Sequence, residues 1–287
     1  MESRNNLVSI IVATKNGAKY IGKAIESVLN QTYKNFELLI MDGGSTDNTK
    51  EVVHSYLADP RVQWIYKKDK HRSEGLNNGI KISKGDYIAI LDDDDFWPDP
   101  KKLEKQVNFL EEHPDYILVS GGVINIDDAG REVCRRLLPE KDEGIKKIML
   151  FDCLLPHSAV MFRKEGWELV GGYNTNLGYA SEDWDLWFRM GKIGKFYSFP
   201  EYLICSLWSQ ESRTLWYKKK NLKANLELRK KYRKDYPDFW KGYLLGWLYY
   251  LYSFSPLKQL VRPVNRQFKN IFFNKQIYKK VNKSNKK

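Results

Sequence analysis

The chain has 287 residues, 42% of them hydrophobic, and can bury the core of one large domain. Its formal charge of +12 is uneven: residues 213–287 hold 21 Lys and Arg against 3 Asp and Glu, a net +18, which leaves 12 − 18 = −6 for residues 1–212. The three cysteines form no C-x-x-C pair, so neither a zinc site nor a disulfide framework is predicted, and a reducing cytoplasm fits best. The sequence therefore predicts an acidic globular body followed by a basic extension.

The first hundred residues alternate between strand-like and helix-like apolar patterns. Strands are predicted at residues 7–13, 36–41, 61–66 and 86–91. A helical pattern or helix start follows each strand, and the last of these helices opens at Pro98 and Pro100. The run at 7–13 holds Ser9 and lacks a small-residue cleavage site, so we interpret it as a buried strand rather than a signal peptide. This β-α-β-α order predicts a mostly parallel sheet with helices on both faces.

The pattern from about residue 115 onward is less regular. Further strands are predicted at residues 116–126, 158–164 and 202–208. A helix is predicted at 181–190, because Ser181 is a good N-cap residue and acids follow in the first turn. No internal repeat and no low-complexity linker precedes the basic extension.

Three polar clusters fall where predicted strands end: Thr14-Lys15-Asn16, Asp42-Gly43-Gly44-Ser45 and Asp92 to Asp95. Parallel sheets of this kind bind ligands beyond the carboxyl ends of their strands. The chain has no P-loop and no G-x-G-x-x-G after a strand, so a phosphate ligand would need another source of positive charge. Four adjacent carboxylates repel one another unless a cation lies among them, and a divalent metal would meet both needs. The alternative is a solvated acidic loop.

Four sequence blocks carry a family resemblance over about residues 7–210. They are "VSIIVATKNGAKYIGKAIESVLNQTYKNFELLIMDGGSTDNT", "DKHRSEGLNNGIKISKGDYIAILDDDDFW", "HSAVMFRKEGWELVGGYN" and "SEDWDLWFRM". In this order and spacing they resemble family 2 glycosyltransferases of the bacterial polysaccharide type. The resemblance implies the GT-A fold, a Rossmann-like, mostly parallel α/β sheet flanked by helices. It implies a catalytic domain at residues 1–212 and leaves residues 213–287 as a helical, basic and aromatic extension.

The resemblance also implies roles for single residues. The nucleotide-sugar donor would be bound by Ala13, Thr14, Asn16, Asp42, Gly43, Arg72, Asp92 and Asp93. Mn²⁺ or Mg²⁺ would be held by Asp94, with Asp92 as a second ligand. The catalytic base would be Asp183, with Glu182 beside it, and the acceptor-site candidates are Trp97, His157 and Trp184. Many relatives have a second acid where this chain has Gly43, which leaves the nucleoside open, with UDP the first choice.

Several of these residues have plain structural alternatives. Trp97 and His157 are equally compatible with core packing, and Arg72 with a surface position. Glu182 and Asp183 at a helix start also complement the helix dipole. Asp185 is predicted to be solvated or salt-bridged rather than catalytic.

The predicted reaction is an inverting, metal-dependent transfer of a sugar to a hydroxyl group. Metal bridging the diphosphate oxygens stabilises the leaving group, and a separate carboxylate takes the proton of the attacking hydroxyl. The acceptor is predicted to be a glycan or a polyprenyl-linked glycan in polysaccharide or lipopolysaccharide assembly. The alternatives are a metal-dependent nucleotidyltransferase, a nucleotide-sugar hydrolase, and a catalytically silent membrane-bound scaffold.

The extension contains 19 residues, 239–257, with Lys241 as their only charge and eight aromatic side chains. A helix in the plane of an anionic membrane surface is favoured, because Tyr and Trp prefer the headgroup region and basic segments flank the run. A helix packed on the catalytic domain or on a second subunit, and a spanning helix, are the alternatives. We therefore expect a peripheral position on the inner face of the cell membrane. No nucleic-acid module accompanies the basic segments, and the last dozen residues are expected to be disordered.

Overall fold

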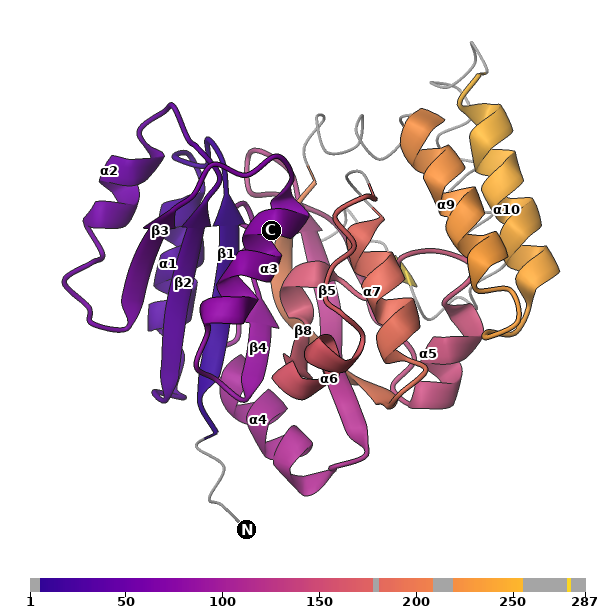
Figure 1. Ribbon diagram of the computed structural model, residues 1–287, viewed down its shortest axis with the longest axis horizontal. Coiled ribbons are helices and arrows are strands. Elements are labelled where there is room, and N and C mark those ends of the chain that lie inside the picture. Colours follow the sequence, from indigo (N-terminus) through magenta and orange to yellow (C-terminus); the bar gives the residue numbers. More distant parts are fainter. Residues whose placement is uncertain (1–5, 178–180, 209–218, 255–277, 280–287) are drawn as a thin grey trace, which may run out of the picture.

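The computed structural model describes residues 6–177, 181–208, 219–254 and 278–279. Figure 1 shows a central sheet with helices packed against it and a helix pair at the end of the molecule farthest from β3. The strands are β1 (Val8–Thr14), β2 (Phe36–Asp42), β3 (Val62–Tyr66), β4 (Tyr87–Ile90), β5 (Tyr116–Ile126), β6 (Glu132–Arg136), β7 (Met161–Arg163), β8 (Lys195–Leu207) and β9 (Tyr278–Lys279). The helices are α1 (Ile21–Leu29), α2 (Thr49–His54), α3 (Arg72–Ile82), α4 (Lys102–Glu112), α5 (Asp142–Ile148), η1 (a 3₁₀ turn, His157–Ala159), α6 (Lys164–Leu169), α7 (Glu182–Met190), α9 (Lys219–Lys231) and α10 (Phe239–Tyr252).

The sheet has the strand order β3-β2-β1-β4-β7-β5-β6-β9, and β8 also pairs with β5. The first four strands are parallel, as the alternating pattern predicted. β7 runs antiparallel to both of its neighbours, β4 and β5, so the second half of the sheet is mixed. The carboxyl ends of β1, β2 and β4 therefore lie at one edge, where the polar clusters were expected.

The strand predicted at 158–164 is shorter than expected. His157–Ala159 form η1, the strand itself covers only Met161–Arg163, and Lys164 already begins α6. The backbone of this turn places the His157 and Ser158 side chains beneath the acidic loop, where they contact Asp92 and Asp95. This correction matters for function, because a regular strand would point these two neighbouring side chains to opposite faces of the sheet.

Helices cover both faces of the sheet, in agreement with the sequence. Alternate side chains of β1 separate the two cores: Val8, Ile10 and Val12 pack with α1 and α4, and Ile11 packs with α3 and the α7 region. The front of the sheet in Figure 1 carries α3 and α7. Both helices begin at the edge that holds the acidic loop.

The helix α9 joins the same core as α7. Its residues Leu226 and Leu228 are buried, and Lys231 Nζ lies 2.8 Å from a carboxylate oxygen of Asp185 on α7. Asp185 is thus salt-bridged and fully buried, which selects one of its two predicted states. Among the residues described, no helix is long and apolar enough to cross a membrane. The predicted boundary at 212 and 213, residues 255–257 of the aromatic run and the last dozen residues, apart from Tyr278 and Lys279, lie outside the described ranges.

Candidate active site

A cavity of about 320 Å³ lies at the carboxyl ends of β1, β2 and β4 and at the starts of α3 and α7. Eight of the predicted donor-site, metal-site and catalytic residues line it: Ala13, Thr14, Gly43, Arg72, Asp92, Asp93, Asp94 and Glu182. The remaining wall consists of residues to which the sequence assigned no individual role: Lys15, Met41, Asp69, Lys70, His71, Ser73, Gly75 and Leu177. The wall has five carboxylates against three Lys and Arg side chains, an excess of 5 − 3 = 2 negative charges. The basic side chains of the wall do not balance its carboxylates, so a bound cation would stabilise the cavity.

Asp92 is the acid of this loop that the chain itself neutralises. One of its carboxylate oxygens lies 3.2 Å from Arg72 Nη2 and 2.9 Å from His157 Nδ1. Burial alone would raise the pKa of Asp92, but Arg72 and His157 outweigh it and hold that pKa well below its usual range. His157 in turn contacts the Tyr173 hydroxyl through Nε2, at 2.9 Å. His157 is therefore a buried, bonded histidine that orients Asp92.

Asp93 is held by the loop after β1. The Thr14 hydroxyl donates to its carboxylate at 2.5 Å. A Cβ at Gly17 would lie 2.4 Å from the same carboxylate oxygen, so glycine is the residue that permits this close approach. Burial raises the pKa of Asp93. The sequence singled out Thr14 but gave no sign of Gly17, because the contact joins residues 76 positions apart.

Asp94 differs from its neighbours because no hydrogen bond or ion pair joins its carboxylate to another described residue. Burial, together with the charges of Asp92 and Asp93, raises the pKa of Asp94 to about 7. No side chain of the described residues competes for this carboxylate, and a bound cation would favour its ionised form and lower its pKa.

Asp95 has a structural role. It accepts a hydrogen bond from the Ser158 hydroxyl at 2.6 Å and another from the backbone N–H of Leu207 at 3.1 Å. Phe96 exchanges two backbone hydrogen bonds with Cys205 of β8, at 3.0 and 2.9 Å. These hydrogen bonds join the end of the acidic loop to β8 and η1. They therefore restrict the position of Asp94, which directly precedes Asp95.

A divalent metal fits this donor set in one particular way. In the part of the chain that the structure describes, no three His, Cys, Asp or Glu side chains form a closed metal cage. Mg²⁺ is commonly held by one or two carboxylates together with phosphate oxygens of its substrate. Asp94 meets that requirement, and Asp92, the second ligand expected from the sequence, is engaged by Arg72 and His157.

Asn16 and Asp42 support the cavity from outside its wall. The Asn16 side-chain oxygen accepts a hydrogen bond from the Thr46 backbone at 2.8 Å, and Asn16 adopts a left-handed φ of 59°. Asp42 is buried and accepts hydrogen bonds from the backbone N–H groups of Gly44 and Ser45, at 3.0 and 2.8 Å. The two side chains therefore shape the loops after β1 and β2 that carry Thr14 and Gly43.

A second acidic pair stands at the start of α7. Glu182 lines the cavity, and its carboxylate lies 3.9 Å from Arg72 Nε. Burial, and after it the charge of Asp183, raises the pKa of Glu182. Asp183 accepts hydrogen bonds from the Trp184 backbone at 2.7 Å and from the Cys153 thiol at 3.3 Å. Ser181 is the N-cap residue, but its hydroxyl donates to Asn225 of α9 at 2.8 Å instead of capping the helix. Cys153 escaped sequence reasoning, since nothing in its local pattern indicates a partner 30 residues away.

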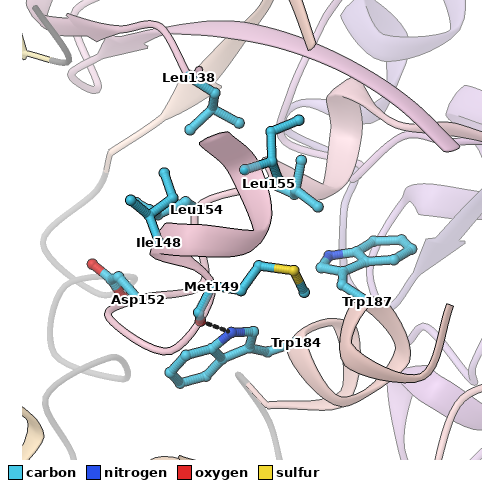
Figure 2. Close-up of a pocket in the computed structure, with 9 residues that line it drawn as sticks. Leu138, Ile148, Met149, Asp152, Leu154, Leu155, Trp184 and Trp187 are labelled. Carbon is cyan, nitrogen blue, oxygen red and sulfur yellow. Dashed lines mark hydrogen bonds between the residues drawn. The ribbon is translucent and has the colours of Figure 1, made fainter. Parts of the chain in front are cut away.

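The two tryptophans proposed for the acceptor site lie in the interior. Trp97 is 3% exposed and donates its indole N–H to the Ser158 carbonyl at 2.8 Å. Figure 2 shows Trp184 on the wall of a small apolar void of about 10 Å³, with its indole N–H bonded to the Met149 carbonyl at 2.9 Å. Both indoles support the loops behind the site, and the structure places neither on the wall of the donor cavity.

The fold and the site together define an α/β protein with a cavity lined by charged residues. The cavity lies at the carboxyl ends of the parallel strands, where the strand order reverses between β1 and β4. The family model named Glycosyl transferase family 2 matches residues 9–165. The uncharacterized glycosyltransferase RP339 of Rickettsia prowazekii is 30% identical over 250 residues, which cover 83% of this chain and 71% of that protein. The chain belongs to glycosyltransferase family 2, and it is a transferase of that family. The family predicted from the four sequence blocks is confirmed.

Two solved glycosyltransferase structures share the GT-A fold with this chain. One is the mannosyltransferase PcManGT from Pyrobaculum calidifontis in complex with GDP-Man and Mn²⁺, with a TM-score of 0.63 and 18% identity over 92% of this chain and 75% of that one. The other is S. aureus TarS in complex with UDP-GlcNAc, with a TM-score of 0.63 and 16% identity over 93% of this chain and 76% of that one. The predicted fold class is confirmed.

Proposed function

We propose that this glycosyltransferase is metal-dependent and inverting, and that it moves a sugar from a nucleotide-sugar, UDP-linked in the first instance, to a hydroxyl of a glycan or lipid-linked glycan. The observation that carries the proposal is the Asp94 carboxylate, half-buried on the cavity wall beside two other acids and left without a partner on the described chain. PcManGT holds GDP-Man with Mn²⁺, and TarS holds UDP-GlcNAc, on the same fold. These ligands support a nucleotide-sugar with a divalent cation at this edge.

The donor diphosphate would lie in the cavity between Asp94 and the basic residues Lys15, Lys70 and Arg72. When bound, Mn²⁺ or Mg²⁺ supplies charge stabilisation for the departing diphosphate. Asp94 is the residue that would hold it. Arg72 would have two tasks, since it already neutralises Asp92 and also borders the space in which phosphate oxygens would sit.

The acceptor hydroxyl would be activated from the α7 side of the cavity. Asp183 would take the hydroxyl proton as the bond to the sugar forms, and Glu182, bound near Arg72, would help to orient the substrate. The leaving diphosphate and the attacking hydroxyl would then be served by different acids, Asp94 and Asp183. One in-line displacement between them inverts the anomeric centre.

Product analysis of purified variants tests the reaction. The wild type should convert a nucleotide-sugar and acceptor to glycosylated acceptor and free nucleoside diphosphate, while Asp94→Ala and Asp183→Asn should lose transfer. Asp128→Asn, an exposed acid outside the cavity, is the matched control and should keep it. Full transfer by folded Asp94→Ala and Asp183→Asn would contradict the proposal.

The same assay separates the other two reaction classes. Release of free sugar and nucleoside diphosphate without glycosylated acceptor would indicate a hydrolase. In a parallel reaction supplied with a nucleoside triphosphate and a sugar 1-phosphate, release of pyrophosphate together with a nucleotide-sugar would indicate a nucleotidyltransferase. No turnover and no effect of metal on nucleotide binding would indicate a silent scaffold. We place the acceptor reaction on the inner face of the cell membrane, where a polyprenyl-linked glycan would be presented.

A further inference from the structure

The helix α10 carries its large apolar side chains on its outward face. Six large apolar side chains on this face are between 38% and 76% exposed. They are Trp240 (76%), Leu244 (60%), Trp247 (38%), Leu248 (45%), Leu251 (58%) and, just past the end of the helix, Phe254 (52%). Their spacing of three and four residues makes them one continuous stripe along the helix. We call these six residues the α10 stripe. An ordinary surface helix carries polar residues at such positions, so the stripe needs a separate explanation.

Two glycines lie on the inward face of α10. A Cβ at Gly242 would lie 2.4 Å from the Leu150 carbonyl oxygen, and one at Gly246 would lie 2.9 Å from the Leu226 side chain on α9. Leu245 between them is 3% exposed. The glycines let α10 approach the body closely, and this packing fixes which face points outward. The orientation of the α10 stripe is therefore a consequence of packing and cannot be reversed by rotating the helix.

Basic residues outnumber acidic ones in the helix pair that carries the stripe. Residues 219–254 contain nine Lys and Arg against three Asp and Glu, a net charge of 9 − 3 = +6. Lys219 Nζ lies 3.7 Å from the ring centre of Phe254, at one end of the stripe. Lys241, next to Trp240, is the only charged residue of α10 itself, and its side chain is 64% exposed. Long basic side chains beside exposed Trp and Leu match the two chemistries of an anionic lipid surface.

We infer that the α10 stripe docks in the plane of an anionic membrane, with Trp240, Leu244 and Leu251 entering the boundary between headgroups and acyl chains. Lys219 and Lys241, the basic residues beside the stripe, would meet the lipid phosphates. Trp is enriched at this depth of membranes, and basic residues near an anionic surface are attracted to it. This contact agrees with the membrane-proximal acceptor proposed above, but it does not depend on the transfer reaction.

A second copy of the chain is the less favourable occupant. It would bring another +6 region against the first, because a symmetric contact places the same patch on both sides. Like charges across an interface oppose association, whereas an anionic surface is attracted. Charge thus selects lipid over self-association for this face.

Vesicle co-sedimentation of the full-length protein tests the assignment. We expect binding to phosphatidylcholine vesicles that contain phosphatidylglycerol, weaker binding to pure phosphatidylcholine, and a decrease as salt is raised. The variant Trp240→Gln/Leu244→Gln/Leu251→Gln changes only exposed side chains and should reduce partitioning roughly tenfold or more. The matched control is Ile82→Gln/Leu169→Gln, at sites that are 53% and 76% exposed elsewhere on the molecule, and it should bind as the wild type does.

Three outcomes would overturn the assignment. They are no vesicle binding by the wild type, equal binding by the α10 triple variant, and a dimer in light scattering that the triple variant dissociates while vesicle binding is unchanged. The last outcome would give the stripe to a second copy. Asp94→Ala should bind vesicles like the wild type whether or not it transfers sugar, so failure of the membrane contact and failure of the proposed reaction are separately visible.

Discussion

Asp185, which is buried, and Asp94, which is half-buried, show how differently this chain treats its negative charges. Asp185 on α7 is fully buried, and its carboxylate meets Arg189 and Lys231 at 2.8 Å each and the Tyr232 hydroxyl at 2.7 Å. Burial would raise its pKa, but these three partners outweigh it and lower that pKa. Asp94 has no such partner among the described residues, and its pKa rises to about 7. A paired acid holds the structure together, whereas an unpaired one awaits a ligand.

The comparison also holds within α7. Glu182 and Asp183 at its first turn face the donor cavity or the Cys153 thiol, and Asp185 one turn on is tied to α9. The first turn of α7 thus carries acids at or near the cavity, and its second turn binds α9 through Asp185. The distinction between the acids proposed as catalytic and the structural acid Asp185 therefore follows the partner that each carboxylate has, rather than its place in the sequence.

The largest effect is expected when the unpaired acid, Asp94, is replaced. We expect Asp94→Ala to reduce kcat/KM for transfer roughly a hundredfold or more, or about 2.7 kcal/mol of transition-state stabilisation. Without nucleotide, its melting temperature should equal or exceed that of the wild type, because a repelling buried charge is removed. Steady-state kinetics and calorimetry measure the two. A variant that unfolds more easily yet transfers normally would reverse the assignment.

The opposite result is expected at Asp185. Replacement by Asn removes the negative charge and turns one of the two acceptor oxygens into an N–H donor that faces other donors, so it should lower the free energy of unfolding by about 3 kcal/mol. Urea unfolding measures the loss, and transfer per folded molecule should stay within a few-fold of the wild type. Asp235→Asn, which removes a more exposed pair with Lys192, is the matched control and should cost less than about 1 kcal/mol.

Variants at Cys153 test whether a neutral hydrogen-bond donor is enough to orient Asp183, the proposed base. Its thiol donates to Asp183 at 3.3 Å, so Cys153→Ala should lower kcat by roughly tenfold and leave KM for the donor unchanged. Cys153→Ser retains a donor at that position and should restore most of kcat. If Ala and Ser variants lose activity equally, the thiol has only a packing role.

The smallest expected effect concerns acid stability. Because the pKa of Asp185 is lower in the folded chain than its ordinary value of 3.8, its contribution is present above that value and is lost as pH falls through the folded pKa. The difference in unfolding free energy between wild type and Asp185→Asn should therefore shrink from about pH 6 to below about pH 3. A difference that grows with acidity would contradict the pairing.

Much of the first half could be predicted from sequence because its signals are local. Apolar runs and turn residues place β1 to β4 and their helices, and the acids of the 92–95 loop directly follow a buried strand. The contacts that separate the four acids are not local. Ser158 reaches Asp95 across 63 residues, and His157 reaches Asp92 across 65. No single-chain pattern reveals such pairs, so the sequence could nominate the loop but could not say which acid remains unpaired.

The same limit explains the errors and omissions elsewhere. Donor contact by Asn16 and Asp42 stays a prediction, and the sequence did not reveal the hydrogen bonds by which the two side chains also brace the loops beside the cavity. The strand at 158–164 was predicted too long, because its apolar residues do not reveal the turn at His157–Ala159. In α10 the aromatic content was visible, but only packing through Gly242 and Gly246 shows which side faces outward.

The most direct measurement is the thermal shift of wild type and Asp94→Asn with UDP or GDP, each with and without Mn²⁺. A ligand that binds only the folded chain raises its melting temperature in proportion to RT ln(1 + [L]/Kd). We predict that one nucleotide stabilises the wild type, that Mn²⁺ enlarges that shift, and that the enlargement disappears in Asp94→Asn. An equal Mn²⁺-dependent shift in both proteins, or none in the wild type, would contradict the claim that Asp94 is left unpaired to hold a cation with the donor.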